Sequence, residues 1–303
     1  MRVDAVPSLG DRTTYLGASD VAAIMGMSPW RSAYQVYLEK RKEVDDWAGN
    51  EASDWGKRME PAIRQWYSDT TGRAVRLPEK IMYHSKYPFM LASLDGFTDD
   101  RRIVEIKTAR NGKGWGEPGT NEIPDYYALQ VHHYMAVTGF EVADVPVSIA
   151  GGPPVLYEVP ADMEIQEMII DVCASFWLRV KEGTPPPPVT YSDAIQRFGQ
   201  SASTGTVIAT EAIIRDAIDL RAIRLSMKEL EAMEEEIKGR LIIAMGDNGD
   251  TLVDPEGNQI ATYRMAKSRE SLDVAAFKKE MPDIYAKYLK TSEPSRRFLL
   301  KGV

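Results

Sequence analysis

Cysteine and histidine are scarce in this chain of 303 residues. It holds one cysteine, Cys173, and three histidines, two of which are adjacent, His132 and His133. A lone cysteine excludes a disulfide framework, a cysteine zinc site and a cysteine-held iron–sulfur cluster. So few histidines also make a histidine-based metal site an unfavoured interpretation. We expect a protein of a reducing, cytoplasmic compartment.

Long apolar runs are also missing. No stretch approaches the roughly 20 residues that cross a bilayer, and the N-terminus lacks a signal-peptide pattern, so no membrane association is expected. The apolar content of 44% and the charged content of 27% are ordinary for a globular protein. The length suits one large domain with an appendage, or two modest domains.

The net charge of −8 argues at first against a nucleic-acid partner. It does not decide the matter, because a metal site needs carboxylates and a local basic patch can contact DNA. The chain is acidic up to about Val189 and turns basic near its C-terminus. The basic residues there are Arg264, Lys267, Arg269, Lys278, Lys279, Lys287, Lys290, Arg296, Arg297 and Lys301.

Four consecutive prolines, Pro185–Pro188, give the strongest break in the chain, because they continue neither a helix nor a central strand. We therefore predict a first domain over residues 1–189. A linker should follow over residues 190–206, which end in a stretch rich in Ser, Gly and Thr. A C-terminal extension should occupy residues 207–303.

The first region mixes helical and strand patterns, which predicts an α/β domain with a short mixed sheet flanked by helices. Ser53 is the expected N-cap of its longest helix, and Gly72 the stop. The expected helices are Asp20–Met25, Ala33–Lys42, Ser53–Thr71, Tyr126–Thr138 and one carrying Ile165, Ile169, Cys173, Phe176, Trp177 and Val180. The expected strands are Lys80–His84, Phe89–Ser93, Ile103–Lys107, Asp144–Ile149 and Val155–Val159.

The second region predicts one long helix, Glu211–Met245, followed by a small α+β module. The module comprises a hairpin over Thr251–Tyr263, a helix near Val274–Tyr288 and a terminal strand, Arg297–Leu300. The long helix has one apolar stripe, formed by Ile213, Ala217, Leu220, Met227, Leu230, Ile237 and Leu241. This stripe packs either on another part of the chain or in a coiled-coil or oligomer contact.

One constellation can carry chemistry. An apolar strand delivers Asp95 into a turn at Gly96, and in the next strand Glu105 and Lys107 share a face because they are two residues apart. Two carboxylates on adjacent strands can bind a divalent metal, and a lysine beside them can orient or deprotonate a water. The D-x9-E-x-K pattern alone fits a surface hairpin with alternating charges better.

Three further segments strengthen the functional interpretation. Glu60 lies on the helix before the strands, Gln130 on the helix after them, and Arg12 stands seven residues before Ser19 near the start. Taken together, residues 12–180 resemble the YqaJ-type viral recombinase family, relatives of lambda exonuclease in the PD-(D/E)xK nuclease superfamily. The proline that commonly precedes the motif aspartate is Leu94 here, and this proline takes no part in the chemistry.

The resemblance assigns a role to each matching residue. It implies that Asp95, Glu105 and the backbone carbonyl of Ile106 bind a metal, and that Glu60 contributes to a second one. The metal would be Mg²⁺ or Mn²⁺, with two ions in the active site. Lys107 corresponds to the catalytic lysine. Gln130 corresponds to the glutamine that helps to place the lysine and the water.

The family's DNA 5′-phosphate site maps to Arg12 and Ser19. A serine hydroxyl at a helix start with an arginine nearby is an anion site in its own right, although a plain helix cap with a surface arginine gives the same pattern. Ser93, just before the active-site aspartate, either contacts phosphate or serves as a structural turn residue.

The resemblance implies a phage- or prophage-encoded 5′→3′ exonuclease in the cytoplasm of a bacterial host. It would resect the ends of linear double-stranded DNA for a single-strand annealing protein, and its relatives form a trimeric ring. Two alternatives stay open: an endonuclease of the same superfamily, and a non-catalytic DNA-end-binding recombination scaffold.

Overall fold

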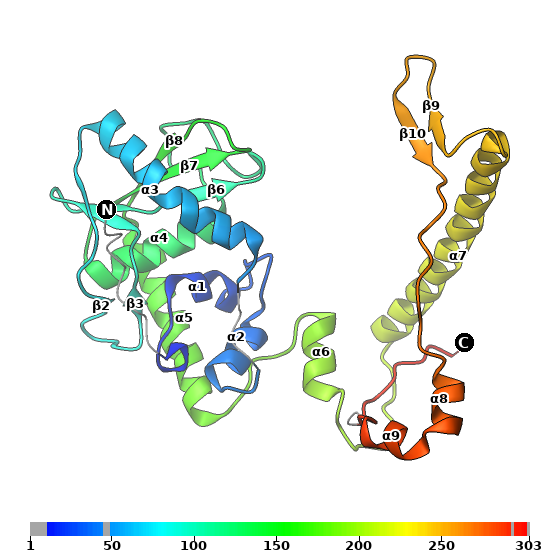
Figure 1. Cartoon of the computed structure of the whole chain (residues 1–303). Coiled ribbons are helices and arrows are strands. Elements are labelled where there is room, and N and C mark those ends of the chain that lie inside the picture. The colour runs from blue at the N-terminus through cyan, green and yellow to red at the C-terminus, as the bar shows by residue number, and fades with distance from the viewer. Residues whose placement is uncertain (1–10, 45–48, 292–293, 302–303) are drawn as a thin grey trace. The chain divides into compact units, whose positions relative to one another are not determined.

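The computed structural model describes residues 11–44, 49–291 and 294–301. It divides into two compact units, Met1–Arg197 and Phe198–Val303 (Figure 1). Within the described ranges, no helix is both long enough and apolar enough to cross a membrane.

The first unit alternates helices and short strands. Its helices are η1 (Arg12–Thr14), α1 (Ala18–Ile24), α2 (Ala33–Lys40), α3 (Glu51–Thr71), α4 (Asp125–Thr138), α5 (Met163–Glu182) and α6 (Tyr191–Phe198). Its strands are β1 (Val75–Arg76), β2 (Met82–Tyr83), β3 (Leu91–Ala92), β4 (Gly96–Thr98), β5 (Arg102–Val104), β6 (Lys107–Ala109), β7 (Val142–Ile149) and β8 (Val155–Pro160).

The central sheet is mixed, as the sequence predicted. Its order is β1-β4-β5-β7-β6, with β8 added on β7. Strands β5 and β6 run parallel to β7, whereas the β1–β4, β4–β5 and β7–β8 pairs are antiparallel. Strands β2 and β3 form a separate pair. The expected fold class, a short mixed sheet flanked by helices, is confirmed.

Helices cover both faces of this sheet. Ile63 and Tyr67 of α3 pack with Val104 and Ile106 in one buried cluster. Ile103 belongs to the larger core, which also contains apolar residues of α4, α5 and β7. Side chains alternate along a strand, so Glu105 and Lys107 lie on the Ile103 face, beneath α4.

The predicted single strand Ile103–Lys107 is interrupted at residues 105–106. Strands β5 and β6 nevertheless keep the same offset against β7, so the segment between them stays extended. The N–H of Glu105 donates to Asp144 O over 2.9 Å. The next bond of this parallel ladder needs an N–H at position 146, and Pro146 has none. The interruption therefore originates in the neighbouring strand.

Several predicted boundaries need correction. Helix α3 is capped by Asn50, not Ser53: the Asn50 side chain accepts from Ser53 N. Gly72 ends the helix as predicted, with φ 71°. The expected linker over residues 190–206 begins instead with α6, whose Asp193 is buried and accepts from the Ser32 hydroxyl over 2.8 Å.

The second unit contains α7 (Glu211–Met245), a β9–β10 hairpin (Thr251–Val253 and Gln259–Thr262), α8 (Val274–Glu280) and α9 (Pro282–Lys287). The long helix and the hairpin match their predictions. The helix expected over Val274–Tyr288 is divided at Pro282, which begins α9. The terminal strand is wrong, since residues 297–300 form neither helix nor strand. Most of the apolar stripe of α7 is exposed, including Ile213, Met227 and Leu230.

Candidate active site

The turn between β3 and β4 places Asp95 at the edge of the sheet. Asp95 Oδ2 accepts the backbone N–H of Ile106 over 2.9 Å, and Arg64 on α3 donates to the Asp95 carbonyl over 3.1 Å. Gly96 follows, and a Cβ there would lie 2.3 Å from Val75 Cγ1, so a larger residue would force the Val75 side chain to shift. Hydrogen bonds to both its side chain and its carbonyl thus hold Asp95 in place.

Glu105, Lys107 and Gln130 form one hydrogen-bonded cluster. Lys107 Nζ lies 2.6 Å from Glu105 Oε1 and 3.0 Å from Gln130 Oε1. Gln130 Nε2 donates to the same Glu105 oxygen over 2.6 Å. The structure therefore brings Gln130 of α4 against Glu105 and Lys107, the two residues that the sequence predicted on one face.

Two tyrosines of α4 complete this cluster. Lys107 Nζ stands 4.6 Å from the centre of the Tyr127 ring, a cation–π contact. Gln130 Nε2 also donates to Tyr134 Oη over 3.1 Å. Neither Tyr127 nor Tyr134 was among the site residues that the sequence predicted. Their spacing from Gln130, three and four residues along a helix, was the available signal.

Three carboxylates share this neighbourhood and perturb one another. Burial, followed by repulsion from Asp95, raises the pKa of Glu105 to about 8. The same two causes raise the pKa of Glu60 to about 7, which places α3 within electrostatic range of the site. Burial also raises the pKa of Asp95, against the attraction of Lys107. Clustered carboxylates with raised pKa values are typical of a site that receives a cation.

The residues present fit a divalent metal. Glu105 Oε2 is buried and has no hydrogen-bond partner, so one carboxylate oxygen is left for a ligand. Because the Ile106 N–H points to Asp95, its carbonyl, on the same edge of an extended chain, points that way too. Among the described residues no three His, Cys, Asp or Glu side chains enclose a metal by themselves. A metal here would depend on two carboxylates, a carbonyl and water, which suits Mg²⁺.

The predicted phosphate-binding residues lie on neighbouring segments. A parallel bridge pairs Leu16 with Met90. Ser19 lies three residues after Leu16, and Ser93 lies three residues after Met90. Ser19 is exposed and Ser93 half-buried. Among the described residues, no hydrogen bond or ion pair joins the side chains of Arg12, Ser19 and Ser93, and their joint role stays a prediction.

A buried ion cluster that the sequence interpretation missed supports this region. Asp20 pairs with Lys40 over 2.8 Å and with Arg31 over 2.9 Å. Lys40 Nζ also donates to the Arg12 carbonyl, and Arg31 donates to the Ser19 carbonyl. One cluster therefore holds the backbones of both predicted phosphate ligands. Sequence alone offered little signal, because these charges come from three separate segments.

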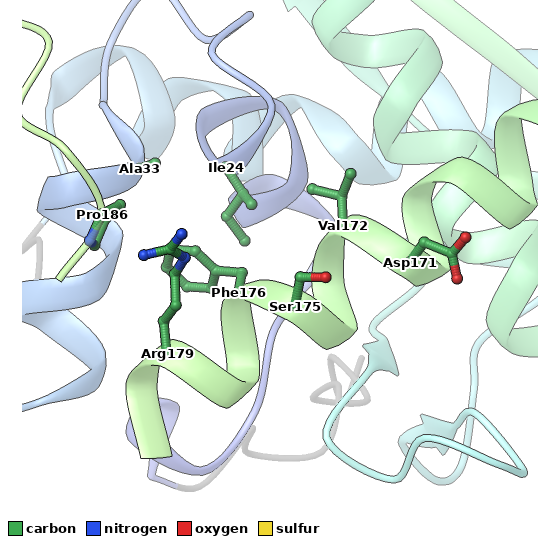
Figure 2. Close-up of a pocket in the computed structure, with 8 residues that line it drawn as sticks. All are labelled: Ile24, Ala33, Asp171, Val172, Ser175, Phe176, Arg179 and Pro186. Carbon is green, nitrogen blue, oxygen red and sulfur yellow. The ribbon is translucent and has the colours of Figure 1, made fainter. Parts of the chain in front are cut away.

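The two pockets near α1 do not coincide with the cluster of Glu105, Lys107 and Gln130. One, of about 300 Å³, has an apolar floor with Ile24 and Phe176 and carries Asp171 and Arg179 (Figure 2). A second, of about 470 Å³, is bordered by Trp30 and the proline run. None of the predicted metal ligands lines either pocket.

Comparison with known proteins agrees with the motifs. Residues 9–141 match the model of the YqaJ-like viral recombinase domain, so the predicted resemblance is confirmed. The protein named YqaJ of Bacillus subtilis (strain 168) is 27% identical over 304 residues, covering 97% of this chain and 93% of that protein.

Solved structures show weaker likeness. The alkaline exonuclease LHK-Exo of Laribacter hongkongensis is 20% identical, with a TM-score of 0.47, covering 57% of this chain and 91% of its own. A phage related exonuclease from Haemophilus somnus 129PT is 13% identical, with a TM-score of 0.44, covering 55% and 94%.

Proposed function

We propose that the protein is a Mg²⁺- or Mn²⁺-dependent deoxyribonuclease that degrades linear double-stranded DNA from its 5′ ends. The observation that carries the proposal is the buried, unpartnered Glu105 Oε2, beside Asp95 and the Lys107–Gln130 pair. A surface hairpin with alternating charges would leave these side chains in solvent. Here Glu105 is 2% exposed.

Each residue would have a distinct task. Asp95, Glu105 and the Ile106 carbonyl would hold one metal, and Glu60 would contribute to a second. The bound metal would acidify a water and offset negative charge on the phosphate in the transition state. Gln130 and Glu105 hold the Lys107 ammonium in place, so that Lys107 can orient the attacking water and offset negative charge on the phosphate.

End recognition would come from Arg12, Ser19 and Ser93, which would hold the terminal 5′-phosphate through charge-assisted hydrogen bonds. The parallel Leu16–Met90 bridge supports this assignment, because it places side by side the two segments that lead to Ser19 and Ser93. The product would be a duplex with 3′ single-stranded overhangs. A phage single-strand annealing protein would take up these overhangs in a bacterial cytoplasm, and a trimeric ring would keep the enzyme on its DNA.

The test uses purified protein with linear and covalently closed circular duplex DNA, each with Mg²⁺ or EDTA. The proposal expects nucleotide release from linear DNA only, and only with the metal. Cutting of circular DNA would favour the endonuclease alternative. End binding without cleavage in Mg²⁺ or Mn²⁺ would favour the non-catalytic scaffold.

A further inference from the structure

Trp30 is an exposed aromatic residue that nothing in the catalytic account uses. Its side chain is 66% exposed in the loop between α1 and α2. The loop is held in place: the Ser28 hydroxyl accepts the N–H groups of Trp30 and Arg31 over 3.2 and 3.3 Å. A large aromatic ring is thus presented to solvent from a fixed backbone.

A continuous row of rings connects Trp30 to the catalytic lysine. The Trp30 and Tyr126 rings meet edge-to-face with centroids 4.9 Å apart, and Tyr126 meets Tyr127 at 4.5 Å. Tyr127 in turn lies 4.6 Å from Lys107 Nζ. An edge-to-face contact occupies at most one face of the Trp30 ring, so another face stays open.

The residue after Trp30 reaches the predicted phosphate site. Arg31 donates to the Ser19 carbonyl over 3.2 Å and pairs with the buried Asp20. Trp30 therefore connects through the tyrosine rings to Lys107, and the next residue, Arg31, contacts the Ser19 segment. Trp30 also borders a hollow of about 470 Å³, together with Arg31, Pro186 and Val189, which has room for a planar group.

We propose that Trp30 stacks on an unpaired nucleobase of the DNA strand being degraded, close to the cleaved bond. The inference rests on the proposed function and adds a DNA-contacting residue to it. A base on one strand must leave its pair before its phosphodiester can reach Asp95 and Glu105. An aromatic ring accepts any base, because every base has a π-face. Trp30 would thus favour strand separation without sequence preference.

The decisive test compares variants at position 30 in the full chain. Trp30→Ala should weaken the binding of duplex DNA with a short unpaired 5′ end roughly tenfold or more, measured in an Asp95→Asn background that holds DNA uncut. Trp30→Phe should retain most of the affinity, and Trp30→Leu should behave like Trp30→Ala. The matched control is Tyr83→Ala, which removes another exposed ring, on β2, and should change nothing.

A photo-crosslink then identifies the contact. Duplexes with 5-iododeoxyuridine at each of the first few 5′ positions should crosslink to Trp30, within the tryptic segment Thr13–Arg31. Wild-type cleavage of linear DNA together with unchanged binding by Trp30→Ala would overturn this inference and leave the nuclease proposal intact. Equal affinity of Trp30→Leu and Trp30→Phe would also overturn it, because apolar packing would then suffice. A wild-type protein that neither binds nor cleaves DNA would overturn both.

Discussion

At the scale of single residues, the proposed chemistry depends on the two carboxylate oxygens of Glu105. One of its oxygens accepts from Lys107 and Gln130, while the other is buried without a partner. The spacing of Glu105 and Lys107 predicted their shared face, because side chains alternate along an extended chain. The contact to Gln130 could not be derived from periodicity, since it depends on where α4 crosses the sheet. Its prediction came from the family resemblance.

The predicted 5′-phosphate ligands can be tested at Arg12. Wild-type protein should degrade 5′-phosphorylated duplex ends roughly tenfold faster than 5′-hydroxyl ends, since a charge-assisted contact contributes on the order of 1.5–3 kcal/mol. Arg12→Ala should remove most of that preference. Initial rates on matched duplexes measure it. Equal wild-type rates on both ends would contradict the assignment and favour the endonuclease alternative.

His133 should make stability depend on pH. Its ring is fully buried on α4 with Nε2 3.0 Å from Leu91 O, and burial lowers its pKa to about 4. The His133 ring therefore binds a second ring proton less readily in the folded state than in the unfolded state. The stability contributed by the neutral ring is therefore complete above about pH 6.5 and is lost as the pH falls towards 4.

The matched variant is His133→Gln, which keeps a donor for Leu91 O but does not titrate. The difference in unfolding free energy between wild type and variant should change by on the order of 3 kcal/mol between pH 7 and pH 4. Urea unfolding across this range measures it. If the unfolding free energies of the wild type and the variant changed with pH in the same way, the His133 ring would not be held neutral.

At the scale of elements, the break between β5 and β6 shows what sequence patterning misses. The run from Ile103 to Lys107 has the alternation of one continuous strand, and its register against β7 is indeed continuous. The ladder fails because Pro146, forty residues away in sequence, supplies no N–H. Such an interruption depends on the partner strand, so a strand's own sequence cannot predict it. The α3 cap was missed for a local reason, because Asn50 and Ser53 are both good cap residues.

The buried cluster of Asp20, Lys40 and Arg31 joins η1, α1 and α2. Burial alone would raise the pKa of Asp20, but Lys40 and Arg31 lower it to about 2. Asp20→Asn would leave the Lys40 ammonium, which is only 2% exposed, without its counter-charge. We expect this variant to lose about 3–5 kcal/mol of unfolding free energy.

The control for Asp20 is Asp99→Asn, which breaks an exposed pair with Arg76 and should cost at most about 1 kcal/mol. Urea unfolding of both variants makes the comparison. If Asp20→Asn were as stable as Asp99→Asn, the cluster would not be the clamp that holds the Arg12 and Ser19 segments.

At the scale of the whole molecule, the two compact units differ in charge and burial. The first carries the carboxylate site, and the second carries the basic stretch 264–301 with an exposed stripe on α7. The proline run marked the approximate end of the first unit. The exact end was not predictable from it, because α6 is fixed by Asp193 through contacts with Ser32 and residues 189–190.

A truncated chain ending at Gln200, after α6, tests the role of the second unit. We expect it to bind duplex DNA more weakly and with a shallower dependence on salt, because fewer phosphate contacts release fewer counterions. Affinity measured over a series of salt concentrations gives the slope. Unchanged affinity and slope would instead make the second unit an oligomerisation or partner-docking element, with the α7 stripe as its contact surface.

The central claim is that Asp95, Glu105 and Lys107 form a metal-dependent nuclease site, and Asp95→Ala tests it most directly. The measurement is the rate of Mg²⁺-dependent nucleotide release from linear duplex DNA, with the exposed Asp99→Ala as control. We predict a loss of at least about a hundredfold for Asp95→Ala and a rate near wild type for the control. Near wild-type cleavage by a folded Asp95→Ala protein would contradict the account.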